Sequence, residues 1–591
     1  MYSTRITDII YSDRQPSGME LHLAITNGGS LEEITGLLDS RAATGAPDVS
    51  PEENALTALL TVAVKNKRED ILVLLLDRGV DINAAGGKYG TALAAAAHGG
   101  EKGMVELLLD RGANLNAVAG EYGTALAVAV KKRREDIVLL LLDRGIDINM
   151  IGGKYGTALT AAAYGGKGGM VGLLLDRGAN IEVVGGECGT ALAAAAYRDW
   201  EKVVSLLLDR GANINAVGGK YGTALAAAAY GGKGGIVRLL LDRGADINMV
   251  GGEYGTALAA AAYRGWKKVV LLLLERGANI NTVGGEFGTA LTAAVFSSQD
   301  LQMLSLLINQ GANINMVAGK YGTALTVAAS ICKDTQMVSL LLYQGADTNA
   351  VGGKYGTALV AAVYTWSLYE EMPPTLLEVV SLLLDRGADI NAVGGKYGTA
   401  LAVAAFRGRN HIVLHLLQKG ADINAVGGVY VTALGAAFFA ERKDMVSLLV
   451  DKGADMDIVI SEFGTVLGHA IYKGSTEMVL FLLQRGADVR FVGGRYSTTS
   501  GEYPSALDVA HSEGSMADAK LVALLEAEVE RFYDSIPRNP FYDSIPRSPF
   551  PVSCPRRISE SYSYRDDRNA FTGDPNELFL KEFCLRGNIY P

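Results

Sequence analysis

The chain has 591 residues, of which 49% are hydrophobic and 20% charged, and its net charge is −10. This length exceeds that of one compact core, the hydrophobic content excludes disorder throughout, and the acidic balance disfavours a nucleic-acid partner for the whole chain. The four cysteines lie far apart without metal-ligand spacing, which fits a reducing compartment; they are Cys188, Cys332, Cys554 and Cys584.

The N-terminal segment, residues 1–17, lacks a long apolar core, so no signal peptide is expected. Apolar runs such as Val269–Leu274 are too short to span a bilayer. We therefore expect a chain of the cytoplasm or nucleus without membrane insertion. Residues 19–41 predict a divergent first helical unit, and a short loop at Ala46 separates it from the next unit.

A repeat then fills most of the chain. The tetrapeptide Gly-Thr-Ala-Leu recurs with steps of 33 residues six times, then 34, 34 and 42, and degenerate copies extend the register in both directions to about 15 units. A fixed period of this size indicates a solenoid. The exact copies begin at Gly90, Gly123, Gly156, Gly189, Gly222, Gly255, Gly288, Gly322, Gly356 and Gly398, and the degenerate ones at Gly18, Leu56, Val431, Gly464 and Pro504.

Each Gly-rich turn leads into a helix, as a phosphate-binding loop does. A P-loop, however, requires Gly-Lys followed by Ser or Thr, whereas Lys220 precedes Tyr221 and the other copies also lack the hydroxyl. A turn that recurs in every unit is better explained as architecture. No nucleotide or other cofactor is therefore expected.

The unit that begins at Gly255 predicts two short helices. Thr256 caps an alanine-rich first helix through its hydroxyl, and a second helix buries Val269 and Leu273 at i,i+4 spacing. Gly277 supplies a left-handed stop, after which an extended turn leads to the next threonine. Stacked units would bury a continuous core that no single unit can form.

These features resemble the ankyrin repeat: two helices, a projecting turn, a 33-residue period and the sequence LLLDRGADIN. The family pattern T-P-L-H-x-A is matched only in part by TALAAA, and the turn Gly-Gly-Lys/Glu-Tyr-Gly is similar to that of ankyrin arrays from filamentous fungi. The resemblance covers residues 18–530. It implies an all-α solenoid with projecting β-turns that binds other proteins.

A second period of 66 residues indicates that two kinds of unit alternate. YGGKGG begins at Tyr164 and again at Tyr230, and YRDWEKVV and YRGWKKVV begin at Tyr197 and Tyr263. The tryptophans of these segments, Trp200 and Trp266, either pack over the turn between the two helices or form exposed anchors for a partner.

The turns carry the side chains expected to recognise a partner, because the alanine helices offer little chemistry. The ring before each last glycine either braces the turn against its neighbour or joins a ladder of rings facing a partner, and methionines suit an adaptable surface. The alternating Lys and Glu beside the rings are interpreted as surface charge balance. The candidate partner-binding residues in the turns are Met150, Tyr155, Tyr221, Met249, Tyr254, Met316, Tyr321 and Tyr355.

About eight extra residues between Tyr364 and Val379 predict a longer loop with Trp366 and Tyr369. This loop is either a neutral insertion or a docking site, and we include both aromatic residues among the partner-binding candidates. Further along, residues 517–532 predict a charged helix that caps the array.

The C-terminal tail, residues 531–591, is expected to be disordered because proline, serine and arginine dominate it. It contains the tandem FYDSIPRNP and FYDSIPRSP. Ser548 precedes a proline and Ser559 follows Arg-Arg-Ile, so both are candidate phosphorylation sites.

No catalytic or metal site is predicted. His411 and His415 have i,i+4 spacing but lack the glutamate of a zinc-protease motif, so we expect neither an enzyme nor a small-molecule substrate. The first hypothesis is a non-enzymatic scaffold that binds proteins along the turn tips and the concave face of the inner helices. The second is a sensor or adaptor subunit of a signalling or ubiquitin-ligase machine whose effector is on another chain.

Overall fold

The computed structural model describes residues 16–43, 52–86, 88–297, 300–331, 335–364, 374–461, 464–490, 492, 505–511 and 515–535. The insertion residues Trp366 and Tyr369 lie outside these ranges. So do the tail beyond residue 535 and, with it, Ser548 and Ser559.

The described residues form thirty α-helices in fifteen consecutive pairs, as the repeat predicts, and one short 3-10 helix, η1 (Gly395–Tyr397). The first helices of the pairs are α2 (Pro16–Thr26), α4 (Glu52–Lys65), α6 (Ala92–Gly99), α8 (Ala125–Lys132), α10 (Ala158–Tyr164), α12 (Ala191–Tyr197), α14 (Ala224–Tyr230), α16 (Ala257–Tyr263), α18 (Ala290–Ser297), α20 (Ala324–Ile331), α22 (Ala358–Tyr364), α24 (Ala400–Arg407), α26 (Ala433–Phe439), α28 (Val466–Tyr472) and α30 (Ala506–Ala510). The second helices are α3 (Leu31–Ala43), α5 (Glu69–Asp77), α7 (Lys102–Asp110), α9 (Glu135–Asp143), α11 (Gly168–Asp176), α13 (Glu201–Asp209), α15 (Gly234–Asp242), α17 (Lys267–Glu275), α19 (Leu301–Asn309), α21 (Thr335–Tyr343), α23 (Pro374–Asp385), α25 (Asn410–Gln418), α27 (Lys443–Asp451), α29 (Thr476–Gln484) and α31 (Ala519–Ser535).

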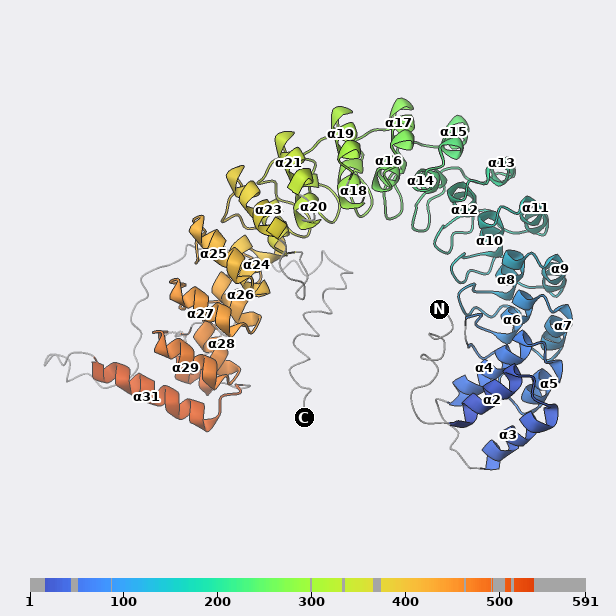
Figure 1. Cartoon of the computed structure of the whole chain (residues 1–591), viewed down its shortest axis with the longest axis horizontal. Helices are drawn as coiled ribbons and strands as arrows, with labels where there is room; N and C mark the ends of the chain where they lie inside the picture. Colours follow the sequence, from blue (N-terminus) through green and yellow to red (C-terminus); the bar gives the residue numbers. More distant parts are fainter. Residues whose placement is uncertain are drawn as a thin grey trace.

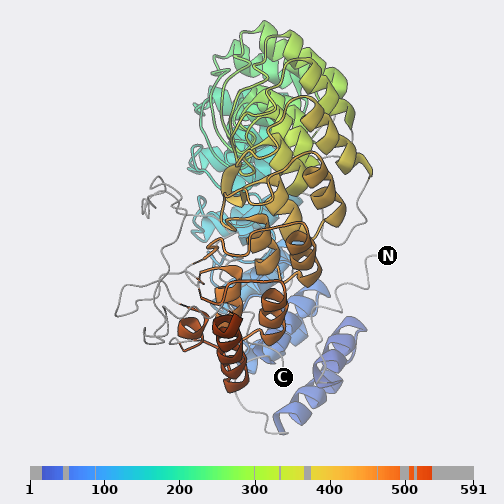
Figure 2. The same ribbon diagram turned by 90° about the vertical axis from the view of Figure 1, so that its left-hand side faces the viewer.

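The pairs stack into an arch (Figure 1). From α6 to α29 the first helix of each pair lies inside the arch and the second lies outside, and we refer to them as inner and outer helices. Seen from the side, the C-terminal arm lies in front of the N-terminal arm (Figure 2). The described residues contain no regular strand, only isolated antiparallel bridges in the turns, such as Gly251 with Gly255.

The inner helices begin where the sequence predicts. The Thr223 hydroxyl accepts a hydrogen bond from the Ala226 N–H at 3.1 Å, and threonines cap most of the other inner helices in the same way. Small side chains then let neighbouring inner helices approach closely, so Ala224–Ala229 are at most 2% exposed. A single cluster of buried apolar side chains runs from Leu21 to Leu525, which makes the core continuous from unit to unit.

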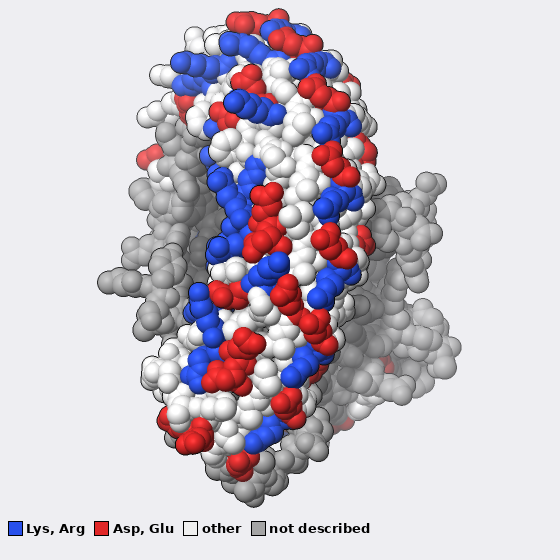
Figure 3. Space-filling model, turned by 90° about the vertical axis from the view of Figure 1, so that its right-hand side faces the viewer, with Lys and Arg blue, Asp and Glu red and all other residues white. Residues whose placement is uncertain are grey.

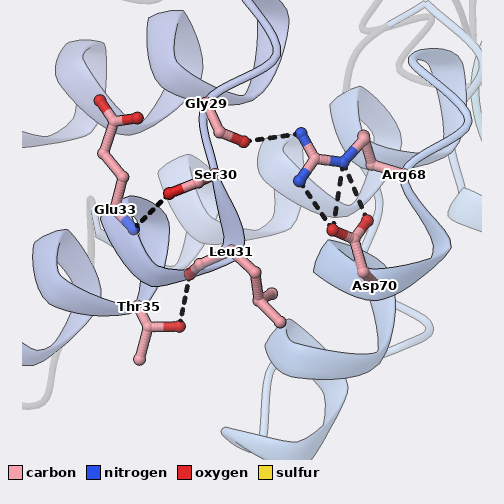
Figure 4. A network of polar contacts seen from close by, with 7 residues as sticks. All are labelled: Gly29, Ser30, Leu31, Glu33, Thr35, Arg68 and Asp70. Atoms are coloured by element: carbon pink, nitrogen blue, oxygen red, sulfur yellow. Dashed lines mark hydrogen bonds and ion pairs between the residues drawn. The ribbon is translucent and has the colours of Figure 1, made fainter.

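The hairpins between inner and outer helices join successive units through side chains. An inner helix leaves its last carbonyl groups without partners, and a side chain of the next hairpin donates to a carbonyl at this end of the helix or just beyond it. Arg68 donates to the Gly29 carbonyl at 2.8 Å while its other nitrogens bind Asp70 (Figure 4). The same role is taken by Arg134 toward Gly99 and by Arg442 toward Phe406.

The two tryptophans take this position as well. Trp200 Nε1 donates to the Tyr164 carbonyl at 3.0 Å, and Trp266 Nε1 donates to the Tyr230 carbonyl at 2.9 Å. A Cβ on Gly166 would lie 2.5 Å from the Trp200 ring, so this ring covers the preceding hairpin. The two rings thus pack over the turn between the helices, as predicted, while Trp200 and Trp266 remain 39% and 41% exposed.

Ion pairs join the outer edge of successive units. The Asp of each LLLDRG segment pairs with the Arg of the next, for example Asp242 with Arg276 at 2.8 Å. Figure 3 shows the resulting column of alternating charges. The column stops at Gln310, because Asn309 and Gln310 replace Asp and Arg. Each pair is partly exposed and contributes at most about 1 kcal/mol. The continuous pairs are Asp39–Arg78, Asp77–Arg111, Asp110–Arg144, Asp143–Arg177, Asp176–Arg210, Asp209–Arg243 and Asp242–Arg276.

None of the helices in the described ranges is both long and apolar enough to cross a bilayer.

Acidification is expected to destabilise the units around α28. His469 is 6% exposed, and its ring lies edge-on to Phe438 and Phe439. Burial and, to a smaller extent, Lys473 lower the pKa of His469 to about 4 from an ordinary value of 6.5. Above pH 6.5 its contribution to stability is complete. Below pH 6.5 the unfolded state binds a proton that the folded state does not, so the free energy of unfolding falls by about 1.4 kcal/mol per pH unit down to pH 4.

Urea unfolding followed by circular dichroism at pH 7.0, 5.5 and 4.5 tests this expectation. The His469→Gln variant should lose less stability than the natural chain over the same pH interval. Equal losses in the two proteins would show that other groups cause the pH dependence.

Candidate protein-binding surface

The turns between successive pairs project toward the inside of the arch (Figure 1). Within one turn, the Gly251 N–H donates to the Gly255 carbonyl at 2.7 Å. Between turns, a ladder of backbone hydrogen bonds with N–O distances of 2.7–3.1 Å runs unbroken over eight steps, so the tips form one ordered surface. The donors and acceptors of this ladder are Glu121 to Lys88, Lys154 to Glu121, Glu187 to Lys154, Lys220 to Glu187, Glu253 to Lys220, Glu286 to Glu253, Lys320 to Glu286 and Lys354 to Lys320.

Direct contact between the turn backbones explains the glycines. Gly255 has φ +80°, and a Cβ there would overlap the backbone of Gly284 and lie 2.8 Å from Gly285 N. Gly252 has φ +68°, and its Cβ would lie 2.6 Å from Lys220 O. Each turn therefore fits into both of its neighbours, and only glycine permits the approach.

A half-exposed row of branched apolar side chains follows the tips. One valine or isoleucine occupies the same place in the turn of eleven consecutive units, directly before Gly-Gly in eight of them, and these side chains are 41–57% exposed. A Cβ on Gly251 would lie 2.6 Å from Val217 Cγ1, so this valine covers the next unit's glycine, and seven members of the row make the same contact. We name it the valine row; its members are Val118, Ile151, Val184, Val217, Val250, Val283, Val317, Val351, Val393, Val426 and Val459.

The family model described as ankyrin repeats (3 copies) matches residues 60–152, 158–251, 227–318, 291–393, 325–427 and 401–492. These matches span most of the chain and coincide with the helix pairs whose turns carry the valine row. The chain belongs to the ankyrin repeat family. Ankyrin repeats are in general protein-interaction modules, so the family supports proteins as the class of partner. No curated protein matches the chain.

The tyrosines of the ankyrin turns lie in an aromatic column between the turns and the ends of the inner helices. Tyr254 stacks on Tyr221 with ring centroids 6.4 Å apart and touches Tyr230 and Tyr263 at 4.7 and 4.9 Å. Burial raises the pKa of Tyr355 to about 12. The candidates Tyr155, Tyr221, Tyr254 and Tyr355 are 8%, 8%, 1% and 7% exposed, whereas Tyr321 is half-buried.

This burial favours the bracing interpretation for the four buried tyrosines, because little of their surface remains for a partner. The predicted ladder of partner-facing rings is therefore reduced to the half-buried rings of Tyr321 and of the other turn tyrosines Tyr89, Tyr122 and Tyr397. Cys188 takes the place of one tyrosine in the column and is itself buried.

The three methionine candidates lie beside the valine row. Met150, Met249 and Met316 are half-buried, and each directly precedes a row member in the sequence. Their flexible thioether side chains widen the apolar strip at three units. The valine row was not predicted from the sequence, although a valine or isoleucine recurs in eleven turns and precedes Gly-Gly in eight of them.

The inner helices contribute less than predicted. Their first six residues are buried in most units, for example Ala257–Ala262 at 0–2% exposure, because the neighbouring inner helices and turns cover them. The expectation that a partner docks on the concave face of the inner helices is therefore wrong for these residues. The turns provide the exposed surface on this side.

The charged tips pair with one another. Lys220 and Glu253 lie 3.4 Å apart, and the Lys88–Glu121, Lys154–Glu187 and Lys320–Glu286 pairs repeat the arrangement. The interpretation of the Lys/Glu alternation as charge balance agrees with these contacts. The pairs leave the valine row bordered by a nearly neutral strip.

Metal-ligating groups do not gather in the described part of the chain. His415 Nε2 lies 3.0 Å from Ser381 Oγ in the neighbouring outer helix, and His411 is exposed. The His415 ring thus packs against the neighbouring outer helix, and the His411 ring faces solvent.

Proposed function

We propose that this ankyrin array is an interaction scaffold that binds partner proteins along the valine row, with the half-buried methionines at its margin. The observation that supports the proposal is the row of eleven half-exposed branched side chains, one in each successive unit, on turns that hydrogen bonds hold in place. A preordered surface loses little conformational entropy on binding. Covering the exposed half of one valine contributes roughly 1 kcal/mol, so several units together give a useful affinity.

Substitution of three adjacent row members is expected to abolish partner capture. Val217→Asp, Val250→Asp and Val283→Asp together remove about 3 kcal/mol of apolar contact and place charge in the strip, so we expect at least a ~100-fold loss of affinity. The matched control replaces the same residues with threonine, which keeps the shape. Affinity purification followed by mass spectrometry measures the result, and thermal melts verify that both variants fold.

Crosslinking locates the contact independently. A lysine-reactive crosslinker should join the partner to tip lysines such as Lys154 and Lys220 more than to hairpin lysines such as Lys202 and Lys268. Undiminished capture by the aspartate variant, or crosslinks confined to the hairpins, would overturn the proposed site.

A further inference from the structure

The hairpins between inner and outer helices carry a concentration of positive charge in the middle of the array. The five hairpins at 131–136, 164–169, 197–202, 230–235 and 263–268 contain 11 basic and 4 acidic residues, in a chain whose net charge is −10. We name these hairpins the basic edge. They lie at the C-terminal ends of α8, α10, α12, α14 and α16, whereas the tips with the valine row lie at the N-terminal ends of the inner helices.

The 66-residue alternation groups the cations of successive hairpins into two triads, Lys132 with Lys167 and Arg198, and Arg198 with Lys233 and Arg264. Hairpins at Lys132, Arg198 and Arg264 alternate with glycine hairpins that carry one lysine each, Lys167 and Lys233. A hollow at the second glycine hairpin shows the consequence. It is lined by Tyr197, Arg198, Tyr230, Gly231, Lys233, Arg264 and Trp266, so three cations from three successive units surround one space.

Aromatic rings hold the arginines of this hollow in place. The Arg198 guanidinium lies 5.0 Å from the centre of the Tyr164 ring, and Arg264 has the same distance to Tyr230. No described carboxylate forms an ion pair with either arginine, and Lys233 has a long pair of 3.8 Å with Asp199. The aromatic rings therefore fix the positions of the arginines, and nearby carboxylates neutralise little of the positive charge of the hollow.

The preceding triad shows the same excess of charge. Lys167 lies in the other glycine hairpin, and its ammonium donates to the Val130 and Lys131 carbonyls. Burial, followed by the repulsion of Arg133, Lys131 and Lys132, lowers the pKa of Lys167 to about 8. An anion placed between these mutually repelling cations would favour their charged forms and reduce the repulsion.

We propose that the basic edge binds an extended acidic segment of a partner protein, with one carboxylate in each triad. Equivalent rings at this edge repeat every 6.2–6.4 Å, as between Tyr197 and Tyr230. Triads two units apart are thus separated by about 12 to 13 Å, which four residues of an extended chain span at ~3.3 Å each. The segment therefore carries Asp or Glu at positions i and i+4.

Stacking geometry favours a peptide over a single-stranded nucleic acid. Nucleic-acid channels use free ring faces on which bases stack, but Arg198 covers a face of Tyr164 and Arg264 covers a face of Tyr230. The carboxylates of an acidic peptide bind through the cations alone and need no free ring face. This acidic-segment site is separate from the valine row and does not depend on the function proposed for that row.

Fluorescence anisotropy with the full chain tests the proposal. The probe is a fluorescein-labelled 12-residue Gly/Ser peptide with Asp at positions 4 and 8, and its comparison peptide has the two Asp side by side. We expect the spaced peptide to bind at least 5-fold more tightly at 50 mM salt and to weaken at 150 mM. Equal binding of the two peptides, or tighter binding of a dT12 oligonucleotide, would overturn the proposal.

Two double variants distinguish the hollow from diffuse attraction. Arg198→Gln with Arg264→Gln removes two cations that line the hollow and should weaken the spaced peptide at least 10-fold. Lys202→Gln with Lys268→Gln removes the same charge from the same hairpins outside the hollow and should change the affinity less than 3-fold. Equal losses of peptide affinity in the two double variants would refute specific binding at the triads. The aspartate variant of the valine row should bind the peptide normally, which keeps this test independent of the proposed function, and thermal melts verify folding.

Discussion

Gly255→Ala is expected to destabilise the array far more than Gly277→Ala, although both glycines have nearly the same φ, +80° and +89°. The left-handed conformation costs an alanine about 1 kcal/mol at either position. At Gly277 the added methyl group meets nothing within 4 Å. At Gly255 it overlaps the backbone of Gly284, so the two turns must separate.

We expect a loss of roughly 3 kcal/mol or more for Gly255→Ala and about 1 kcal/mol for Gly277→Ala. Urea unfolding monitored by circular dichroism gives both values. Because units contact only their neighbours, hydrogen exchange should show the largest loss of protection in α16 and α18. Similar values for the two variants would mean that the interlocked turns do not determine the close stacking.

Tyr254→Ala should have a comparable effect, because this ring belongs to the core. Tyr254 is 1% exposed and packs against four rings, those of Tyr221, Tyr230, Tyr263 and Phe287. Removing a buried aromatic side chain costs about 3 to 5 kcal/mol. Tyr254→Phe keeps the ring and loses only the hydroxyl contact with Tyr230, so it should cost about 1 kcal/mol.

The same urea experiment measures this pair of variants. A cost below 1 kcal/mol for the alanine variant would show that the aromatic column is dispensable for stability. In that case, the interpretation of the turn tyrosines as partner-facing rings would regain its support. The phenylalanine variant also serves as the folded control for partner capture.

Features that depend on a single unit could be predicted from the sequence. The threonine cap at Thr256, the stop at Gly277 and the fifteen pairs all follow from local propensity and the 33-residue period. Ankyrin membership followed from the same residues. These features need no knowledge of how one unit meets the next.

Features that depend on contacts between units could not be predicted in this way. Arg276 pairs with Asp242 of the preceding unit, a contact that the sequence of a single unit does not indicate. Tyr254 is buried only because its neighbours supply rings on both sides. Val217 is exposed while the equally apolar Val204 is buried, and sequence composition does not distinguish the two.

The alternation of two kinds of unit determines which cations lie in consecutive hairpins of the basic edge. Removing a single unit, residues 164–196, would delete Lys167 and bring the hairpins at Lys132 and Arg198 next to each other, so one triad would vanish. Removing residues 164–229 would also leave one triad, made of Lys132, Lys233 and Arg264, but hairpins with several charges and glycine hairpins would still alternate. Steps of 66 residues therefore keep the alternation on which the proposed spacing of the triads depends, whereas steps of 33 residues break it.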